Sequence, residues 1–330
     1  MRKSIVLLVL CLLAAAAGCF AWPQDRALPP TSERDKPEAV GRRETIFYLP
    51  DRDWQFIIPV RFTIPWEEGI ARSTLSHMVE GRLPTELLNA GLSPLLPAGT
   101  EILGLTVRDG LARVDFSRAF LDYEPERERK LLGALIFTLT EFPTVNSVEI
   151  MVEGVTLSRL PGGTAADRDF DREYGLNQET TYSVGNQAKK DLATLYFLYN
   201  TGQQDFFVPV ARPLSPSEDR VKAVAQELLL GPARDSGLHS AIPPGLRLLR
   251  SQLEGSNLRL YLAGELAYTP DGQFSPDRLR DQVALTLTGL AGIAEIAILV
   301  NGKVPQFPDG DSFPLSFNRP GVWNKVATRH

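Results

Sequence analysis

Apolar and polar positions follow one order twice along the chain, over Thr45–Gly154 and again over Thr194–Gly302. Each copy opens with two strand-like apolar segments, and a Gly-Leu to Pro-x-Gly segment returns in the same place, at Gly91–Gly99 and Gly237–Gly245. A period of about 150 residues is far longer than that of a solenoid repeat, so each copy is long enough to bury its own core. The pattern predicts two tandem domains.

Helical spacing of apolar residues predicts a helix after the two opening strands of each copy. In the first copy the helix begins at Glu67-Glu68, whose charges favour the positive end of the helix dipole, and ends at Gly81. In the second copy Ser215–Glu218 supplies an N-cap serine, a proline at the first helical position and a capping-box glutamate, and Gly231 is the expected stop.

A second helix in each copy begins at Glu124-Pro125 and at Ser275-Pro276. Apolar residues one helical turn apart then indicate a buried face. These residues are Leu131, Leu135 and Leu139 in the first copy, and Leu279, Val283 and Leu287 in the second.

Hairpins and closing strands complete the pattern. Asp109-Gly110 between two alternating segments predicts a tight β-hairpin, and Glu254–Asn257 takes its place in the second copy. Alternating strands close the copies at Val148–Val152 and Ile296–Val300. Each copy is therefore predicted to run β-β-α-β-β-α-β. The fold class is α+β, with two tandem homologous domains, each a small, mostly antiparallel sheet with two helices packed on one face.

Pro59 and Pro209 lie inside otherwise regular strand patterns. Because proline cannot donate a ladder hydrogen bond, each strand is expected to be an edge strand or to carry a bulge. The edge could dock a partner by strand addition, or the proline could protect an exposed edge from aggregation.

The N-terminus has the layout of an export signal: Arg2 and Lys3 precede the apolar run Ile5–Ala17, which is too short to span a bilayer. The run closes in Cys19, in a setting that resembles a bacterial lipobox, so we predict that Cys19 is acylated. Cys11 lies inside the apolar run, which leaves Cys19 no disulfide partner. The alternative is ordinary cleavage after a small residue. The protein is predicted to be extracytoplasmic and anchored to the outer face of the plasma membrane.

These patterns divide the chain into six segments. They are a lipoprotein signal peptide (1–19), an extended proline-rich and charged tether (20–43), a first domain (44–160), a solvated linker (161–190), a second domain (191–310) and a C-terminal tail (311–330).

Composition argues against several function classes. The net charge is −5 with acidic and basic residues nearly balanced, so no basic surplus points to nucleic acid or anionic lipid. Three histidines, His77, His239 and His330, have no second ligand at short spacing, which argues against a metal site. Ser240 beside His239 is adjacent only in sequence, and no Gly-rich phosphate loop is present. We therefore predict no catalytic, cofactor-binding or metal-binding residues, no cofactor and no small-molecule substrate.

The chain resembles the GerM family of spore-germination and sporulation lipoproteins. The resemblance lies in Val208–Val210, Glu227–Pro232, Gly237–Gly245 and, in the first copy, Leu135–Pro143. It covers nearly everything after the tether. The first copy departs from the pattern by extra residues before Gly91, so its helix-to-strand loop is expected to be reshaped.

The resemblance implies a non-enzymatic scaffold. Family members are similar to the ring-building modules of envelope assemblies, and GerM-like lipoproteins help to assemble or anchor the channel between mother cell and forespore. The implied partners are envelope or sporulation-complex proteins, with the membrane reached through the N-terminal lipid.

An alternative function is an extracytoplasmic enzyme acting on the cell wall, or a lipoprotein that binds a small ligand. The matched positions of the two copies discriminate between the alternatives, because they are mostly apolar residues, glycine and proline, which specify fold. A duplicated active site would tend to keep matching polar residues. This favours the scaffold.

Overall fold

The structure is a computed structural model that describes residues 41–179, 191–215, 217–266, 275–306 and 313–327. The predicted signal peptide, Cys19 and the tether up to Val40 lie outside the described residues. No helix in the part of the chain that the structure describes is long and apolar enough to cross a membrane.

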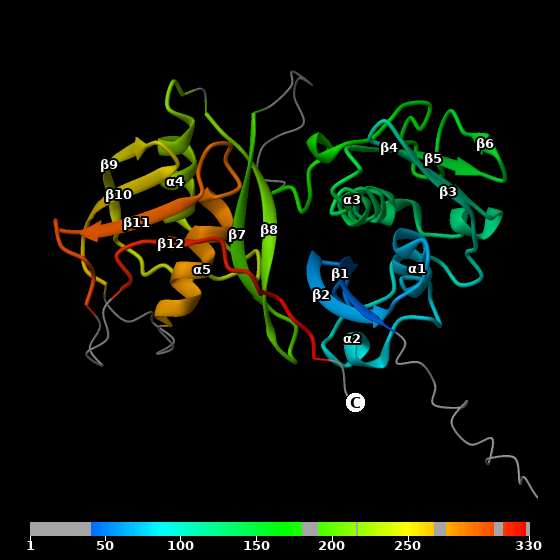
Figure 1. The fold of residues 1–330 in the computed structure, drawn as a ribbon, viewed down its shortest axis with the longest axis horizontal. Coiled ribbons are helices and arrows are strands. Elements are labelled where there is room, and N and C mark those ends of the chain that lie inside the picture. Colours follow the sequence, from blue (N-terminus) through cyan, green and yellow to red (C-terminus); the bar gives the residue numbers. More distant parts are fainter. Residues whose placement is uncertain (1–40, 180–190, 216, 267–274, 307–312, 328–330) are drawn as a thin grey trace, which may run out of the picture. The chain divides into compact units, whose positions relative to one another are not determined.

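The first half of the chain has the predicted order of elements (Figure 1). The extra residues before Gly91 hold a short additional helix, α2, so this loop is reshaped as expected. The elements are β1 (Arg42–Pro50), β2 (Ile57–Pro65), α1 (Ile70–His77), α2 (Thr85–Asn89), β3 (Ile102–Arg108), β4 (Leu111–Phe116), α3 (Glu128–Leu139), β5 (Ser147–Val152) and β6 (Val155–Thr156).

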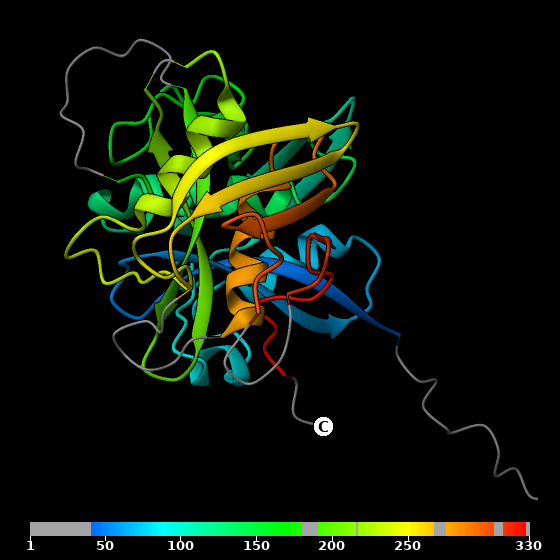
Figure 2. The same ribbon diagram turned by 90° about the vertical axis from the view of Figure 1, so that its left-hand side faces the viewer.

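The second half repeats this order without a counterpart of α2 among its described residues. Figure 2 shows the neighbouring strands β9, β10 and β11 of its larger sheet, coloured yellow to orange. The elements are β7 (Leu192–Asn200), β8 (Asp205–Pro213), α4 (Arg220–Leu230), β9 (Arg247–Glu254), β10 (Asn257–Ala263), α5 (Pro276–Leu287), β11 (Glu295–Val300) and β12 (Phe317–Asn318).

Each half contains two sheets, and together with the helices they give the predicted α+β class. A long two-stranded antiparallel ribbon, β1-β2 or β7-β8, is separate from a four-stranded sheet ordered β3-β4-β5-β6 or β12-β11-β10-β9. Most pairs are antiparallel, but β4 pairs with β5, and β10 with β11, in parallel. Parallel pairing requires a crossover, which α3 and α5 provide. These helices contact both sheets of their half, β1 and β5 for α3, β7 and β11 for α5.

The hairpin and one helix start are confirmed, whereas two helix starts differ. Asp109 and Gly110 both have positive φ, at 50° and 83°, as a tight type I′ turn requires. Ser275 caps α5 by accepting a hydrogen bond from the Arg278 N–H. Helix α4, however, is capped by Asp219 and not by Ser215, because the Asp219 carboxylate accepts from the Lys222 N–H closer to the apolar stripe.

The predicted start of the first helix at Glu67-Glu68 is also wrong. Gly69 adopts a left-handed φ of 79°, which interrupts helical geometry, and α1 begins only at Ile70. The two glutamates therefore precede the helix.

Residues that we interpreted as a solvated linker are folded as far as Glu179. Ala166, Phe170 and Leu176 are buried, and Phe170 exchanges backbone hydrogen bonds with Val148 of β5. The predicted tail behaves in the same way: Phe317 in β12 pairs with Ile296 of β11. Neither segment has a regular apolar period, because each buries isolated side chains and not a continuous face.

The buried carboxylate of Glu128 holds the loop that follows β6. It accepts hydrogen bonds from the Gly162 and Thr164 N–H groups and from the Tyr123 hydroxyl. A Cβ at Gly162 would lie 2.6 Å from the Pro125 carbonyl oxygen, so only glycine fits there.

The buried apolar side chains of the two halves form one continuous cluster. Each half packs its own sheets and helices, but β2 of the first half also contacts β8 of the second. The expectation that each copy buries an independent core therefore has to be modified: the ribbons join the two cores.

Candidate interaction site at the proline-bearing edges

Pro59 and Pro209 lie at outward-facing positions of β2 and β8. Each strand pairs with one neighbour only in the described sheets, as the prolines predicted. Pro59 lies opposite Tyr48, whose N–H donates to Thr138 Oγ1 at 3.2 Å. Since N–H and C=O of one residue point to the same side of an antiparallel strand, the missing proline N–H faces away from β1 and costs no ladder bond.

The same contact recurs in the second half. Tyr196 lies opposite Pro209 and donates its N–H to Thr286 Oγ1 at 3.0 Å. Tyr48 is thus the structural counterpart of Tyr196.

On the outward side of β8, the side chain of Asn324 forms hydrogen bonds with the strand backbone. Its Oδ1 accepts from the Phe207 N–H at 2.8 Å, and its Nδ2 donates to the Phe207 carbonyl at 2.7 Å. The same Nδ2 also donates to the Pro59 carbonyl at 2.7 Å. One buried amide therefore joins the proline-bearing strands of both halves.

Asn177 makes the equivalent contacts, with the roles of β2 and β8 exchanged. Its Oδ1 accepts from the Ile57 N–H at 2.8 Å, and its Nδ2 donates to the carbonyls of Ile57, at 2.7 Å, and Pro209, at 2.8 Å. Ile57 is the counterpart of Phe207, and Asn177 of Asn324. The two asparagines are related by an approximate two-fold exchange.

Backbone hydrogen bonds extend this exchange. We call Leu176–Glu179 and Trp323–Val326 the exchange segments. The first bonds Ala211 of β8 through the Leu176 carbonyl, at 2.9 Å, and the Glu179 N–H, at 3.3 Å. The second bonds Arg61 of β2 through the Asn324 carbonyl, at 2.9 Å, and the Val326 N–H, at 3.1 Å. The C-terminal segment of each half thus forms hydrogen bonds with the edge strand of the other half.

A buried ion pair reinforces one of the two exchanges. The Arg212 guanidinium donates to both carboxylate oxygens of Glu179, at 2.7 and 2.8 Å, and to Glu227 Oε2 at 3.2 Å. Burial by itself lowers the pKa of Arg212, but the two carboxylates outweigh it and raise the pKa. The pair is charged and closely hydrogen-bonded.

A matched arginine precedes each exchange segment and ties it to the preceding helix. Arg172 Nε donates to Thr140 Oγ1, and Arg319 Nη1 donates to Thr288 Oγ1 and to the Leu285 carbonyl. Arg172 also pairs with Glu141, which accepts from the Tyr48 hydroxyl at 2.8 Å.

The tyrosines at this junction are protonated. Burial, and after it the Glu141 carboxylate, raises the pKa of Tyr48 well above its ordinary value, and burial raises the pKa of Tyr196. Burial and the Asp51 carboxylate, which accepts from the Tyr199 hydroxyl at 2.9 Å, raise the pKa of Tyr199 to about 12. Phenols of this kind do not act as bases at neutral pH.

A family model described as "Germane: Sporulation and spore germination" matches residues 45–158 and 194–305. The chain belongs to the Germane (GerM) family. It is 28% identical over 278 residues to "Spore germination protein GerM" of Bacillus subtilis (strain 168), with 83% of this chain and 75% of the relative covered. A solved structure of the tandem GerMN domains of the sporulation protein GerM from Bacillus subtilis matches with a TM-score of 0.75 and 25% identity, over 87% of this chain and all of that one.

The side chains of His77 and Ser240, which the sequence singled out, bond other groups of their own GerM-type domain in the described ranges. His77 bonds the Ser73 carbonyl within α1, and the Ser240 hydroxyl bonds the Gln282 side chain and not His239. No group of three or more His, Cys, Asp or Glu that could hold a metal ion occurs among the described residues. His330 lies outside them.

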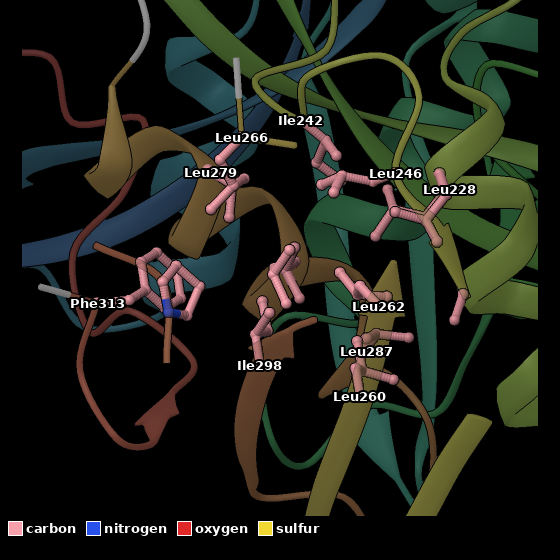
Figure 3. A pocket seen from close by; sticks show the side chains of 15 residues that line it. Leu228, Ile242, Leu246, Leu260, Leu262, Leu266, Leu279, Leu287, Ile298 and Phe313 are labelled. Atoms are coloured by element: carbon pink, nitrogen blue, oxygen red, sulfur yellow. The ribbon is translucent and has the colours of Figure 1, made fainter. Parts of the chain in front are cut away.

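The second GerM domain contains an apolar cavity of about 20 Å³ between α4, α5 and the larger sheet (Figure 3). Its lining includes Leu228, Leu260, Val283 and Phe313, and every lining side chain is apolar. A space of this volume has room for about one water molecule, which would find no polar partner. The cavity is therefore a gap in the packing of the core.

The two GerM domains also share an exposed feature on the edge strands β3 and β9. Leu103 is an extra residue between Ile102 and Gly104 in the register of β3 with β4, and Leu249 is the extra residue at the equivalent β-bulge of β9. These leucines are 46% and 64% exposed. A bulge re-aims a side chain, and here it turns the same apolar residue outward in both domains.

Proposed function

We propose that this GerM-family chain is a non-enzymatic scaffold of the cell envelope that acts through protein–protein contacts in a sporulation or germination complex. The sporulation or germination process in this proposal is taken from the names of the relatives. The observation that carries the proposal is the nature of the groups matched in both halves: Thr138 with Thr286, Arg172 with Arg319, Asn177 with Asn324. All of them bond the chain's own backbone or helices. The polar residues matched in the two halves therefore maintain the fold and hold the halves together.

The matched leucines of the bulges are the surface on which we place the contact with another envelope protein. The edges at Pro59 and Pro209, predicted as possible docking edges, are occupied by the exchange segments at the positions described above. In contrast, β3 and β9 each pair on one side only in their sheets and expose apolar side chains. Exposed apolar residues that recur on both domains fit a partner with an apolar contact surface.

Replacing both bulge leucines by aspartate tests this surface. In sporulating cells, the Leu103→Asp/Leu249→Asp variant is expected to lose at least about tenfold of its cross-linking to envelope proteins, the change for an apolar anchor worth about 1.4 kcal/mol or more. Thr106→Asp, at an exposed polar position of β3, is the matched control and should retain full cross-linking. Equal cross-linking of the double variant and the control would place the contact elsewhere.

The membrane anchor is the second part of the proposal. Cys19→Ser removes the only thiol placed for acylation at the end of the apolar run, so the protein is expected to move from the membrane pellet to the soluble fraction with both domains folded. Cys11→Ser, inside the apolar run, is the control and should leave the protein in the pellet. Recovery of Cys19→Ser in the pellet would contradict lipid anchoring without bearing on the domain contacts.

A further inference from the structure

The two exchange sites are similar in their backbone hydrogen bonds but differ in side-chain chemistry. Phe62 follows Arg61 in β2 as Arg212 follows Ala211 in β8. Val326 bonds the Arg61 carbonyl as Glu179 bonds the Ala211 carbonyl. All four side chains are buried, with Phe62 4%, Arg212 5% and Val326 6% exposed, and the Glu179 side chain 9% exposed. One site buries apolar side chains beside the partly exposed Lys325–Glu44 ion pair, and the other buries an ion pair.

The ionic site is completely bonded only when Glu179 and Arg212 meet. Glu179 occupies Nε and Nη2 of the guanidinium in a two-point contact. Nη1 binds Glu227 of α4, and Nη2 also donates to the Gly231 carbonyl. Glu179 comes from the first half, whereas Arg212, Glu227 and Gly231 belong to the second. A buried charge that loses its partner is strongly destabilising, because it keeps its desolvation cost without compensation.

We propose that the Glu179–Arg212 pair is a specificity determinant, which makes the first half accept the second half and reject a like half from another copy of the chain. In a pair of two first halves, Glu179 would lie beside Phe62, with no guanidinium. In a pair of two second halves, Val326 would lie beside Arg212, and Nε would lose its acceptor. The site of Phe62 and Val326 does not discriminate in this way, since its buried side chains carry no charge and its Lys325–Glu44 ion pair is partly exposed to solvent.

The inference has a consequence for assembly. Because the exchange surface is approximately two-fold, a duplicated chain with two alike sites could pair its halves with those of a second copy and form linked oligomers. The ion pair removes this alternative by leaving mismatched pairs with an unsatisfied buried charge. Copies of the chain then meet other proteins, or each other, through surfaces other than the exchange segments. This conclusion does not depend on the scaffold role.

The test uses the full chain with a protease site inserted within residues 180–190. The purified protein is incubated at high concentration, cut without unfolding, and analysed by native mass spectrometry, which distinguishes unlike from like pairs of halves by mass. The wild-type chain is expected to give unlike pairs only. Glu179→Val/Arg212→Phe makes the buried side chains of the two sites alike, and like pairs should appear at a fraction at least about tenfold above the wild-type background.

Two further variants keep the test decisive. Glu254→Val/Arg259→Phe makes the same chemical change at an exposed ion pair between β9 and β10 and should give unlike pairs only. Glu179→Arg/Arg212→Glu/Glu227→Gln restores an ion pair with reversed polarity without placing two carboxylates together, and it should also give unlike pairs only. Like pairs in the wild-type chain, or no increase in the Glu179→Val/Arg212→Phe variant, would overturn the proposal. If that double variant fails to fold, like pairs in the reversed-polarity variant would overturn it.

Discussion

Asn324→Ala is expected to lower the free energy of unfolding by about 2 to 4 kcal/mol. The side chain makes three hydrogen bonds inside the molecule, all between 2.7 and 2.8 Å: one from the Phe207 N–H, and one each to the Phe207 and Pro59 carbonyls. Alanine leaves a buried N–H and two buried carbonyl groups without this partner, and each unsatisfied group costs about 1 to 3 kcal/mol, reduced where water enters. Urea unfolding followed by circular dichroism would measure the change.

The chain provides two controls for this variant. Asn318→Ala removes an exposed asparagine six residues away and should change the free energy of unfolding by less than about 0.5 kcal/mol. Asn177→Ala removes the equivalent contacts at a partly buried site and should cost somewhat less than Asn324→Ala. If Asn324→Ala and Asn318→Ala unfold alike, the asparagine does not join the two strands.

Features of the fold that depend on local spacing could be predicted from the sequence. The apolar stripe containing Leu135 is buried on α3, Asp109-Gly110 forms the expected turn, and Pro59 lies on an edge strand. Each of these signals acts within about ten residues, where periodicity and turn chemistry are physically determined. The repeat also predicted that both halves would share these elements, and they do.

The contacts between the halves could not be predicted in this way. Asn324 and Pro59 are 265 residues apart, and neither the asparagine nor its segment has an apolar period. A single amide that bonds backbone groups leaves no pattern in the sequence. One signal was available: Arg172 and Asn177 are separated by the same number of residues as Arg319 and Asn324. This spacing, in segments interpreted as linker and tail, shows that the repeat continues beyond the closing strands.

Arg212 shows a second reason why the contacts between the halves could not be predicted from the sequence. In the sequence it stands at the end of an apolar strand, where a charged residue normally indicates exposure. Its burial depends on two carboxylates, Glu179 from the other half and Glu227 from α4. Burial of a charge is therefore a property of the assembled interface, and pattern analysis of one copy cannot detect it.

Leu135→Ala is expected to lower the free energy of unfolding by about 2 to 5 kcal/mol, because the side chain is 0% exposed and its truncation leaves a cavity in the closely packed core beneath α3. Val283→Ala, at the counterpart position on α5, should cost about 1 to 3 kcal/mol, since fewer atoms are removed and the side chain already lines a small cavity. Leu230→Ala is the matched control: Leu230 ends α4 at 75% exposure, so its loss should cost less than about 0.5 kcal/mol. Urea unfolding of the intact chain at one protein concentration gives all three values. An unchanged midpoint for Leu135→Ala would mean that α3 does not bury this face.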